Sequence, residues 1–365
     1  MQTPKKFDRN SPESRAYRQE VRDNTFTREG MMVAFPTCMP GETVPIAHDE
    51  SLIAALDVTP EGTVFGGTSG KQTHLFLADF HAESGIVFDL GVVGGATSCA
   101  AVCCGIGSVL AFVNGERGGR IISARLMPAP RGFIQEWNIS RPTFDDLGEC
   151  FPGEPVVHAT ATPQAAVGIT RNHLFTADLK TPKLQVIGEV PGAGRIAVSS
   201  NGSVVGFDGN THLWNYDPEA RTIRRKAFAL PEGSWDHGSV WARDSQGGLL
   251  YTADSEGRLF SFDESRAFSK PLGRAPLAPV GPMAVTLDGR LFGFCGAEIA
   301  KMFCYNPRNS EVSTLGVAVS VVERRRYGYV FGDAVTGRDG EIIFGENDNG
   351  GHLWLYFPRI QSARA

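Results

Sequence analysis

The sequence contains no long uninterrupted run of apolar residues. No stretch reaches the roughly 18 consecutive apolar residues that a membrane-spanning helix needs. The first 30 residues are polar and charged, and they lack the apolar centre of a secretory signal. We therefore expect a soluble, cytoplasmic protein with no membrane partner.

Positive charge is scarce and dispersed. The 365-residue chain has 35 Lys and Arg against 40 Asp and Glu, a formal net charge of -5 and a pI near 5.9. The longest run of arginine is Arg324, Arg325 and Arg326. Proteins that bind nucleic acid through their surface carry a basic patch or stripe, so no nucleic-acid partner is expected.

The seven cysteines do not form a disulfide framework. Their number is odd, and they lie mostly within apolar, strand-like sequence, at positions 38, 99, 103, 104, 150, 295 and 304. Such cysteines are typical of buried free thiols in a reducing compartment. Cys103 and Cys104 are adjacent, but no His or Cys pair at metal-ligand spacing accompanies them, so no zinc site is predicted.

Glycine is abundant, and the sequence repeats internally. The 43 glycines follow no collagen-like period, so they indicate many tight turns between short strands. A two-residue apolar step, usually Leu followed by an aromatic residue, recurs after a short polar turn at Leu75-Phe76, Leu174-Phe175, Leu213-Trp214, Leu259-Phe260, Met302-Phe303 and Leu353-Trp354. The steps are 39 to 51 residues apart, except for one interval of 99 residues that Ile121-Ile122 divides in two. The sequence thus contains seven similar units.

Each unit has the pattern of four short strands. In the first unit a strand leads to a turn at 59–62, a second strand follows over 63–67, and a further turn precedes the Leu-aromatic strand. A last strand often closes with Leu-Gly, as at Leu90-Gly91. Four strands in a repeat of about 40 to 50 residues are typical of a propeller blade. We predict an all-β fold, a single seven-bladed β-propeller with four-stranded antiparallel blades over residues 31–360.

The sequence also predicts the structure of the N-terminal segment. Residues 1–30 are expected to form an N-terminal arm or a short helix outside the ring. Residues 31–35 are apolar and could supply the strand that completes the last blade, which would remove a free sheet edge. The structural alternative is an array of β-sandwiches, but sandwiches do not repeat one apolar signature seven times.

Candidate site residues come from the loops before the first strand of each unit, because these loops surround the central funnel of a propeller. Three histidines lie at such positions: His48, His158 and His237. Histidine exchanges protons near neutral pH and can act as a general acid or base, although it can equally cap a turn. His237 is the strongest candidate because Trp235 and Trp241 flank it with aromatic surface.

In the last unit the corresponding position holds the three arginines, followed by Tyr327 and Tyr329. A run of arginines is either a solvated surface or a cluster that recognises carboxylates through bidentate pairing. Both interpretations of Arg326 and its neighbours stay open. The funnel mouth could thus combine His, Arg and Tyr.

Other polar residues favour structural interpretations. His74, His173, His212 and His352 recur immediately before the Leu-aromatic step, which is typical of a hydrogen bond that stabilises each repeat. The polar turn 344–351 could hold a hard cation such as calcium, but it lacks the full spacing of an EF-hand loop. A hairpin turn stabilised by Asp and Asn side chains is the favoured interpretation of this segment. The identity of any cofactor stays open.

The repeat also resembles a known group of enzymes. Gly66-Gly67-Thr68, His74-Leu75-Phe76 and Asp217-Pro218 illustrate a blade pattern that is similar to the seven-bladed propellers of carbohydrate-active enzymes, especially lyases of uronate-containing polysaccharides. The resemblance is one of architecture and covers most of residues 46–358. It implies that a His or Tyr takes the proton beside the uronate carboxylate while an Arg neutralises that carboxylate.

Carried onto this sequence, the resemblance implies two sets of residues. The implied catalytic residues are His237, His158 and Tyr327. The implied substrate-binding residues are Arg326, Trp235, Trp241, Tyr329 and His48, with the two Trp side chains stacking on sugar rings. If these roles are correct, His237, His158 and the Arg326-Tyr327 pair should lie within about 10 Å of one another, the scale of a small-ligand pocket.

These observations lead to one expected function and two alternatives. We expect a lyase that acts on uronate-containing oligosaccharides, or on another small polar ligand, in the central funnel. Without a secretory signal, either the substrate is a short imported oligosaccharide or the sequence lacks its leader. The alternative is a non-catalytic propeller scaffold that binds a protein or small-molecule partner there, although not a WD-repeat protein, because regular Gly-His and Trp-Asp endings are absent. A metal-dependent propeller acting on lactones would need acidic residues that converge on the channel.

Overall fold

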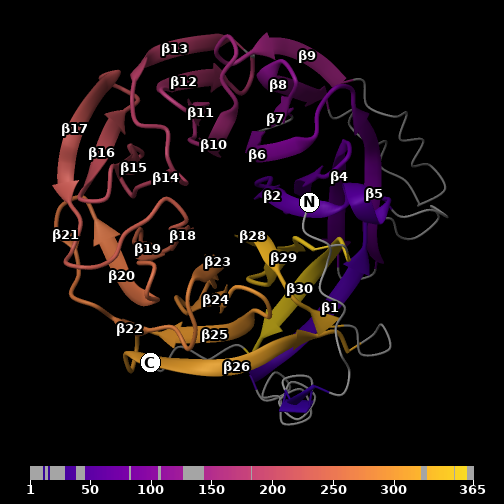
Figure 1. The fold of residues 1–365 in the computed structure, drawn as a ribbon, viewed down its shortest axis with the longest axis vertical. Coiled ribbons are helices and arrows are strands. Elements are labelled where there is room, and N and C mark those ends of the chain that lie inside the picture. The colour runs from indigo at the N-terminus through magenta and orange to yellow at the C-terminus, as the bar shows by residue number, and fades with distance from the viewer. Residues whose placement is uncertain are drawn as a thin grey trace.

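The chain folds into a closed ring of seven antiparallel β-sheets, shown in a computed structural model (Figure 1). The structure describes residues 11–12, 15–16, 29–37, 46–81, 84–105, 108–125, 144–181, 183–321, 327–348 and 350–359. Each sheet is a blade, and its first strand lies nearest the centre of the ring (Figure 1). The predicted all-β, seven-bladed propeller is therefore confirmed.

The first four blades each contain four strands in sequence order. A short 3-10 helix, η1 (His48–Glu50), precedes the first blade. Blade 1 consists of β2 (Leu52–Val58), β3 (Val64–Ser69), β4 (Thr73–His81) and β5 (Ser84–Val93). Blade 2 consists of β6 (Ser98–Gly105), β7 (Ser108–Gly115), β8 (Gly118–Arg125) and β9 (Phe144–Glu149). Blade 3 consists of β10 (Val156–Ala161), β11 (Ala165–Thr170), β12 (His173–Asp178) and β13 (Leu184–Glu189). Blade 4 consists of β14 (Ala197–Val198), β15 (Val204–Asp208), β16 (His212–Asp217) and β17 (Thr222–Ala229).

The remaining blades vary this plan. Blade 5 consists of β18 (Trp241–Arg243), β19 (Leu250–Ala253), β20 (Arg258–Asp263), and a fourth strand broken into β21 (Ala267–Phe268) and β22 (Gly273–Arg274). Blade 6 consists of β23 (Val280–Val285), β24 (Leu291–Cys295), β25 (Lys301–Asn306), β26 (Glu311–Val319) and the short β27 (Tyr327–Gly328). Blade 7 consists of β28 (Phe331–Thr336), β29 (Ile342–Glu346), β30 (His352–Pro358) and the N-terminal strand β1 (Gly30–Pro36).

Strand β1 closes the ring as the sequence predicts. It pairs antiparallel with β30 from Gly30 opposite Pro358 to Pro36 opposite His352. It also contacts blade 6, since the Val321 N–H donates to the Met32 carbonyl at 3.0 Å. The outermost strand of the last blade therefore comes from the beginning of the chain, as Figure 1 shows.

The Leu-aromatic steps form the third strand of their blades and build the core. Their aromatic side chains are fully buried: Phe76, Phe175, Trp214, Phe260, Phe303 and Trp354. Clusters of these rings with residues of the adjacent blade hold neighbouring sheets together, as in the core cluster that contains both Trp354 of blade 7 and Phe294 of blade 6. Burial of such rings against the next blade explains why the step recurs once per repeat.

Two other predictions can be compared with the described residues. The six cysteines among the described residues are buried and free, as expected, while Cys38 lies outside the described residues. In the same part of the chain, no helix is long and apolar enough to cross a membrane. Most of the N-terminal arm predicted for residues 1–30 lies outside the described residues, so that prediction stays untested.

Candidate functional site

A cavity of about 270 Å³ lies at the centre of the ring. Its lining comes from blades 1 to 5 and 7, from first strands or the segments leading into them, except for Leu250 on the second strand of blade 5. Its charged and aromatic lining residues are Asp57, His158, Arg195, Trp241, Arg243 and Asp333. The closed ring therefore brings together polar side chains that are far apart in the sequence.

Local irregularities in the first strands position two of these groups. The register between first and second strands shifts just before His158 in blade 3 and just before Asp333 in blade 7. Ala55 and Ala101 occupy the same repeat position in blades 1 and 2. Bulges are common beside functional sites because the extra residue re-aims the side chains that follow. In blades 1 and 2 this position therefore holds a buried alanine of the hydrophobic core, whereas in blades 3 and 7 it holds a polar residue that lines the cavity.

Arg195 connects the loop between blades 3 and 4 to blade 7. Its Nη1 donates to Asp333 Oδ1 at 2.5 Å, and its Nη2 donates to the Gly332 carbonyl at 2.5 Å. Asp333 Oδ2 in turn accepts the Leu56 N–H of blade 1 at 2.8 Å. The Trp241 indole donates to the Arg195 carbonyl at 3.1 Å and holds this loop in place. These bonds use two of the five guanidinium N–H donors.

Asp57 lies on the first strand of blade 1 and faces blade 2. Its Oδ2 accepts the Cys104 N–H at 2.7 Å, and its Oδ1 accepts the Val58 N–H at 2.8 Å. Loss of hydration in the channel raises the pKa of Asp57 to about 6, although the two N–H donors oppose that rise. Asp57 can therefore exchange a proton close to neutral pH.

His158 is held in the neutral form. Loss of hydration lowers the pKa of His158 to about 3, and the positive charge of Arg195 acts in the same direction. Its Nδ1 accepts the Ile196 N–H at 3.3 Å. A neutral imidazole that accepts at Nδ1 carries its proton on Nε2, so His158 offers an N–H donor rather than a free base.

Of the site residues predicted from the sequence, His158 and Trp241 line the cavity. Trp241 is half-buried at the start of β18, and its ring packs against Phe207 and Phe262 at centroid distances of 5.7 and 6.3 Å. It presents a fixed aromatic surface to the channel. Its predicted role in stacking on a sugar ring stays a prediction.

Trp235 and His237 occupy different environments from the one expected. Trp235 is 5% exposed, packs against Phe260 and Phe268, and donates its indole N–H to the Pro231 carbonyl at 2.8 Å. Its ring belongs to the hydrophobic core between blades 4 and 5, where a sugar could reach it only by displacing core residues. His237 is exposed in the loop before β18 and does not line the cavity.

The remaining predicted residues also lie outside the cavity lining. Tyr327 in β27 and Tyr329 just after it are half-buried. His48 is exposed in η1. Arg326, with Arg324 and Arg325, falls outside the described residues, so its role stays a prediction. Of the set expected to converge, His158 is the member that the described structure brings to the central cavity.

The histidines at the start of the third strands make structural contacts. His74 lies between two carboxylates, with Nε2 at 3.2 Å from Glu50 and Nδ1 at 3.1 Å from Asp89. His173 Nδ1 lies at 3.2 Å from Glu154. Glu50 and Glu154 each lie two residues before a first strand, so blades 1 and 3 repeat the same contact. This arrangement supports the structural interpretation of the repeated histidines.

The polar turn between β29 and β30 has the geometry of a side-chain-stabilised turn. Asp348 Oδ1 accepts the Gly350 N–H at 2.7 Å. Within the described ranges, no three His, Cys, Asp or Glu side chains are grouped in a way that could hold a metal ion. The carboxylates that do reach the channel, Asp57 and Asp333, are instead hydrogen-bonded to backbone N–H groups of the next blade.

Sequence reasoning missed Asp57, Arg195 and Asp333. The two aspartates had a usable signal, because each is a carboxylate within an otherwise apolar first strand, where burial requires a partner. Arg195 gave no such signal, since it is one arginine in a loop. Its partner lies 138 residues further along the chain.

Comparisons with known proteins bear on the fold. No protein-family model and no curated protein matches the sequence. Two similar solved structures are of virginiamycin B lyase from Staphylococcus aureus: a catalytically inactive histidine-to-alanine variant with quinupristin, and the selenomethionine-substituted protein. Both are 10% identical to this chain, with TM-scores of 0.60 and 0.61, and the matches cover 90% and 89% of this chain and 99% of theirs.

A third similar structure is a structural genomics protein of unknown function from Bacteroides thetaiotaomicron. It is 10% identical, has a TM-score of 0.51, and the match covers 91% of this chain and 77% of that one. At these identities the likenesses establish the propeller fold alone. These three structures do not confirm the resemblance to polysaccharide lyases.

Proposed function

We propose that the central cavity is the active site of a lyase whose substrate carries a carboxylate beside an acidic carbon–hydrogen bond. The observation that carries the proposal is the grouping of Asp57, His158 and Arg195 in one cavity. A proton acceptor, a neutral N–H donor and a cation are the groups that such an elimination requires. The proposed substrate is the terminal unit of a short uronate-containing oligosaccharide.

The size of the cavity favours a small ligand. Its volume of about 270 Å³ is near the lower end of the range for ligand pockets, about 300–1,000 Å³. One sugar unit fits such a volume better than a long stretch of polysaccharide. Trp241 supplies the aromatic wall on which a sugar ring stacks.

The proposed reaction assigns one role to each group. Asp57 removes the proton from the carbon beside the substrate carboxylate. The electron pair of that bond forms a carbon–carbon double bond, while the bond from the next carbon to the leaving oxygen breaks. Asp57 then returns the proton to the leaving oxygen, so the reaction consumes no proton. Arg195 and the Nε2–H of His158 stabilise the negative charge that develops on the substrate carboxylate.

The similar structures add limited support. Two of them are of a propeller lyase, and one of these is a catalytically inactive variant that lacks a histidine. That likeness supports a lyase on this fold and indicates no uronate substrate. The proposed chemistry rests on the side chains of the cavity.

A second function, a non-catalytic binding scaffold, is favoured by a specific observation. Asp57 and Asp333 each accept a backbone N–H from the following blade, at 2.7 and 2.8 Å. Carboxylates used in this way hold the inner strands of the ring together. Under this alternative the cavity binds a small polar molecule or a segment of a partner protein without converting it.

Activity measurements separate the two functions. The purified protein is incubated with uronate-containing oligosaccharides, and absorbance of the unsaturated uronate is followed; quinupristin, which accompanies one similar lyase, is tested in parallel by chromatography. We expect Asp57→Asn to lower kcat/KM by about 10²–10⁴-fold, the usual contribution of general acid–base catalysis. Wild-type kcat/KM should rise with pH through about 6 as Asp57 loses its proton.

The matched control is His237→Ala, because His237 is exposed outside the cavity. Its activity should equal that of the wild type. If folded wild-type protein converts none of the compounds, the scaffold is favoured over the lyase. If His237→Ala abolishes activity while Asp57→Asn retains it, the proposed assignment of the base is wrong.

A further inference from the structure

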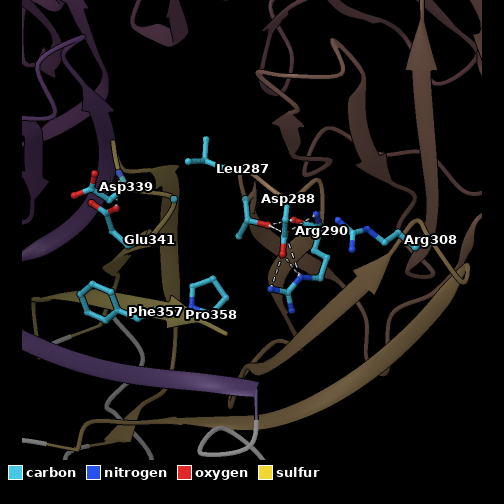
Figure 2. Close-up of a pocket in the computed structure, with 10 residues that line it drawn as sticks. Leu287, Asp288, Arg290, Arg308, Asp339, Glu341, Phe357 and Pro358 are labelled. Carbon is cyan, nitrogen blue, oxygen red and sulfur yellow. Dashed lines mark hydrogen bonds and ion pairs between the residues drawn. The ribbon is translucent and has the colours of Figure 1, made fainter. Parts of the chain in front are cut away.

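A second and larger cavity, of about 620 Å³, opens between blades 6 and 7 (Figure 2). Blade 6 contributes the turn between β23 and β24, and blade 7 contributes the turn between β28 and β29 and the end of β30. These turns follow the first strands, whereas the loops around the central funnel precede them. The second cavity therefore lies on the opposite face of the ring from the funnel mouth.

The cavity has an exposed apolar wall. Leu287 is 48% exposed and Phe357 is 40% exposed, and both rank among the large hydrophobic side chains that remain accessible. Pro358 continues this wall beside Phe357, as Figure 2 shows. The volume of this cavity is well within the range of ligand pockets, about 300–1,000 Å³. A concave site with accessible apolar side chains favours a ligand that has an apolar body.

Charges around the cavity are unevenly compensated. Asp288 and Arg290 neutralise each other, since Arg290 Nε lies at 2.9 Å from Asp288 Oδ2, and the Arg290 Nη2 donates to the Arg359 carbonyl. Asp339 and Glu341 lie together on the blade 7 side. Glu341 accepts the Asp339 backbone N–H at 3.0 Å, and among the described residues neither carboxylate forms an ion pair.

The distribution of charge fixes the orientation of a ligand. Arg308 lies across the cavity from Asp339 and Glu341 in Figure 2. A cationic end is attracted to the two carboxylates of blade 7, on the side of the cavity away from Arg308. An anionic group at the apolar wall would instead face the like charges of these two carboxylates.

We propose that this cavity binds a small amphipathic cation, a primary ammonium group on an apolar body. The ammonium group hydrogen-bonds to Asp339 and Glu341, and the apolar body covers Leu287 and Phe357. Charge-assisted hydrogen bonds of this kind are about twice as strong as neutral ones. The site is independent of the central cavity, because the two share no lining residue.

The test is calorimetric titration of the full chain with 2-phenylethylammonium, and with 2-phenylethanol and 3-phenylpropionate as neutral and anionic analogues. We expect the ammonium compound to bind more tightly than both analogues. The double variant Asp339→Asn/Glu341→Gln should weaken ammonium binding by at least about tenfold, since hydrogen bonds to charged groups contribute more than neutral ones. Glu341→Gln keeps an acceptor for the Asp339 N–H.

Two further variants keep the result interpretable. Glu61→Gln is the matched control, because Glu61 lies in the equivalent turn of blade 1 and should leave binding unchanged. Asp339→Asn alone replaces an exposed side chain and serves if the double variant does not fold. Equal binding of the ammonium compound and the alcohol, or wild-type binding by the carboxamide variants, would overturn the proposal.

Discussion

At the scale of single residues, the central channel favours the uncharged forms of His158 and Asp57. The same loss of hydration lowers the pKa of His158 to about 3 and raises the pKa of Asp57 to about 6. The two shifts have opposite signs because a histidine is charged when protonated and an aspartate when deprotonated. They therefore affect the free energy of unfolding in opposite directions as the pH changes.

The contributions of these two residues to stability can be separated by substitution. As pH falls below 6.5, the unfolded chain protonates His158 while the folded protein does not, so stability is lost down to about pH 3. As pH falls below about 6, the folded protein protonates Asp57 before the unfolded chain does near 3.8, so stability is gained. In urea unfolding at pH 7 to 4, the wild type should lose stability relative to His158→Gln and gain stability relative to Asp57→Asn. Slopes of the same sign would contradict this assignment.

At the scale of the strand, four blades place a glycine of the second strand opposite the aromatic residue of the third. The cross-strand pairs are Gly66 with Phe76, Gly168 with Phe175, Gly206 with Trp214 and Gly293 with Phe303. A methyl group on Gly168 would overlap the Phe175 ring. In blade 2 the equivalent pair is Ala111 with Ile122. Blades 5 and 7 instead pair Thr252 with Phe260 and Phe344 with Trp354, so glycine is one of several ways in which a third-strand ring is accommodated.

This pairing predicts a specific rescue. Gly168→Ala should lower the free energy of unfolding by about 1–3 kcal/mol, the usual cost of overpacking a core. Adding Phe175→Ile recreates the pair found in blade 2 and should recover part of that loss. Chemical denaturation of the single and double variants measures the coupling. Additive losses from the two substitutions would show that the ring and the glycine do not interact.

At the scale of the whole molecule, stability depends on closing the ring. Strand β1 covers the edge of β30, and Met32 and Ala34 are buried in the core between blades 6 and 7. The Ala34 N–H also donates to Ser320 Oγ at 3.1 Å. An open ring would expose both that core and an unpaired sheet edge.

Truncation tests this closure. Removing residues 1–37 should destabilise the protein by more than the about 2–5 kcal/mol expected for truncating one buried Met side chain, and should promote aggregation. Removing only residues 1–28 leaves β1 intact and is the control. Thermal unfolding and light scattering report the two effects. A propeller that unfolds at the same temperature without β1 would contradict this account.

The fold was predictable because its determinants are local. Each Leu-aromatic step, such as Leu174-Phe175, marks a third strand whose ring is buried against its neighbours, and this requirement recurs at regular spacing. The apolar segment 31–35 could be assigned to the closing strand for the same reason. Strand patterns are encoded over a few residues, so sequence alone determined the seven blades and the position of His158 at the start of one of them.

The candidate site was decided by the tertiary structure. Asp57, His158, Arg195 and Asp333 meet because the ring brings blades 1, 3 and 7 around one channel. No local pattern pairs Arg195 with Asp333, and none distinguishes Trp241 at the cavity from Trp235 in the core. The charge states of Asp57 and His158 likewise depend on loss of hydration inside the closed channel, which exists only when all seven blades are in place.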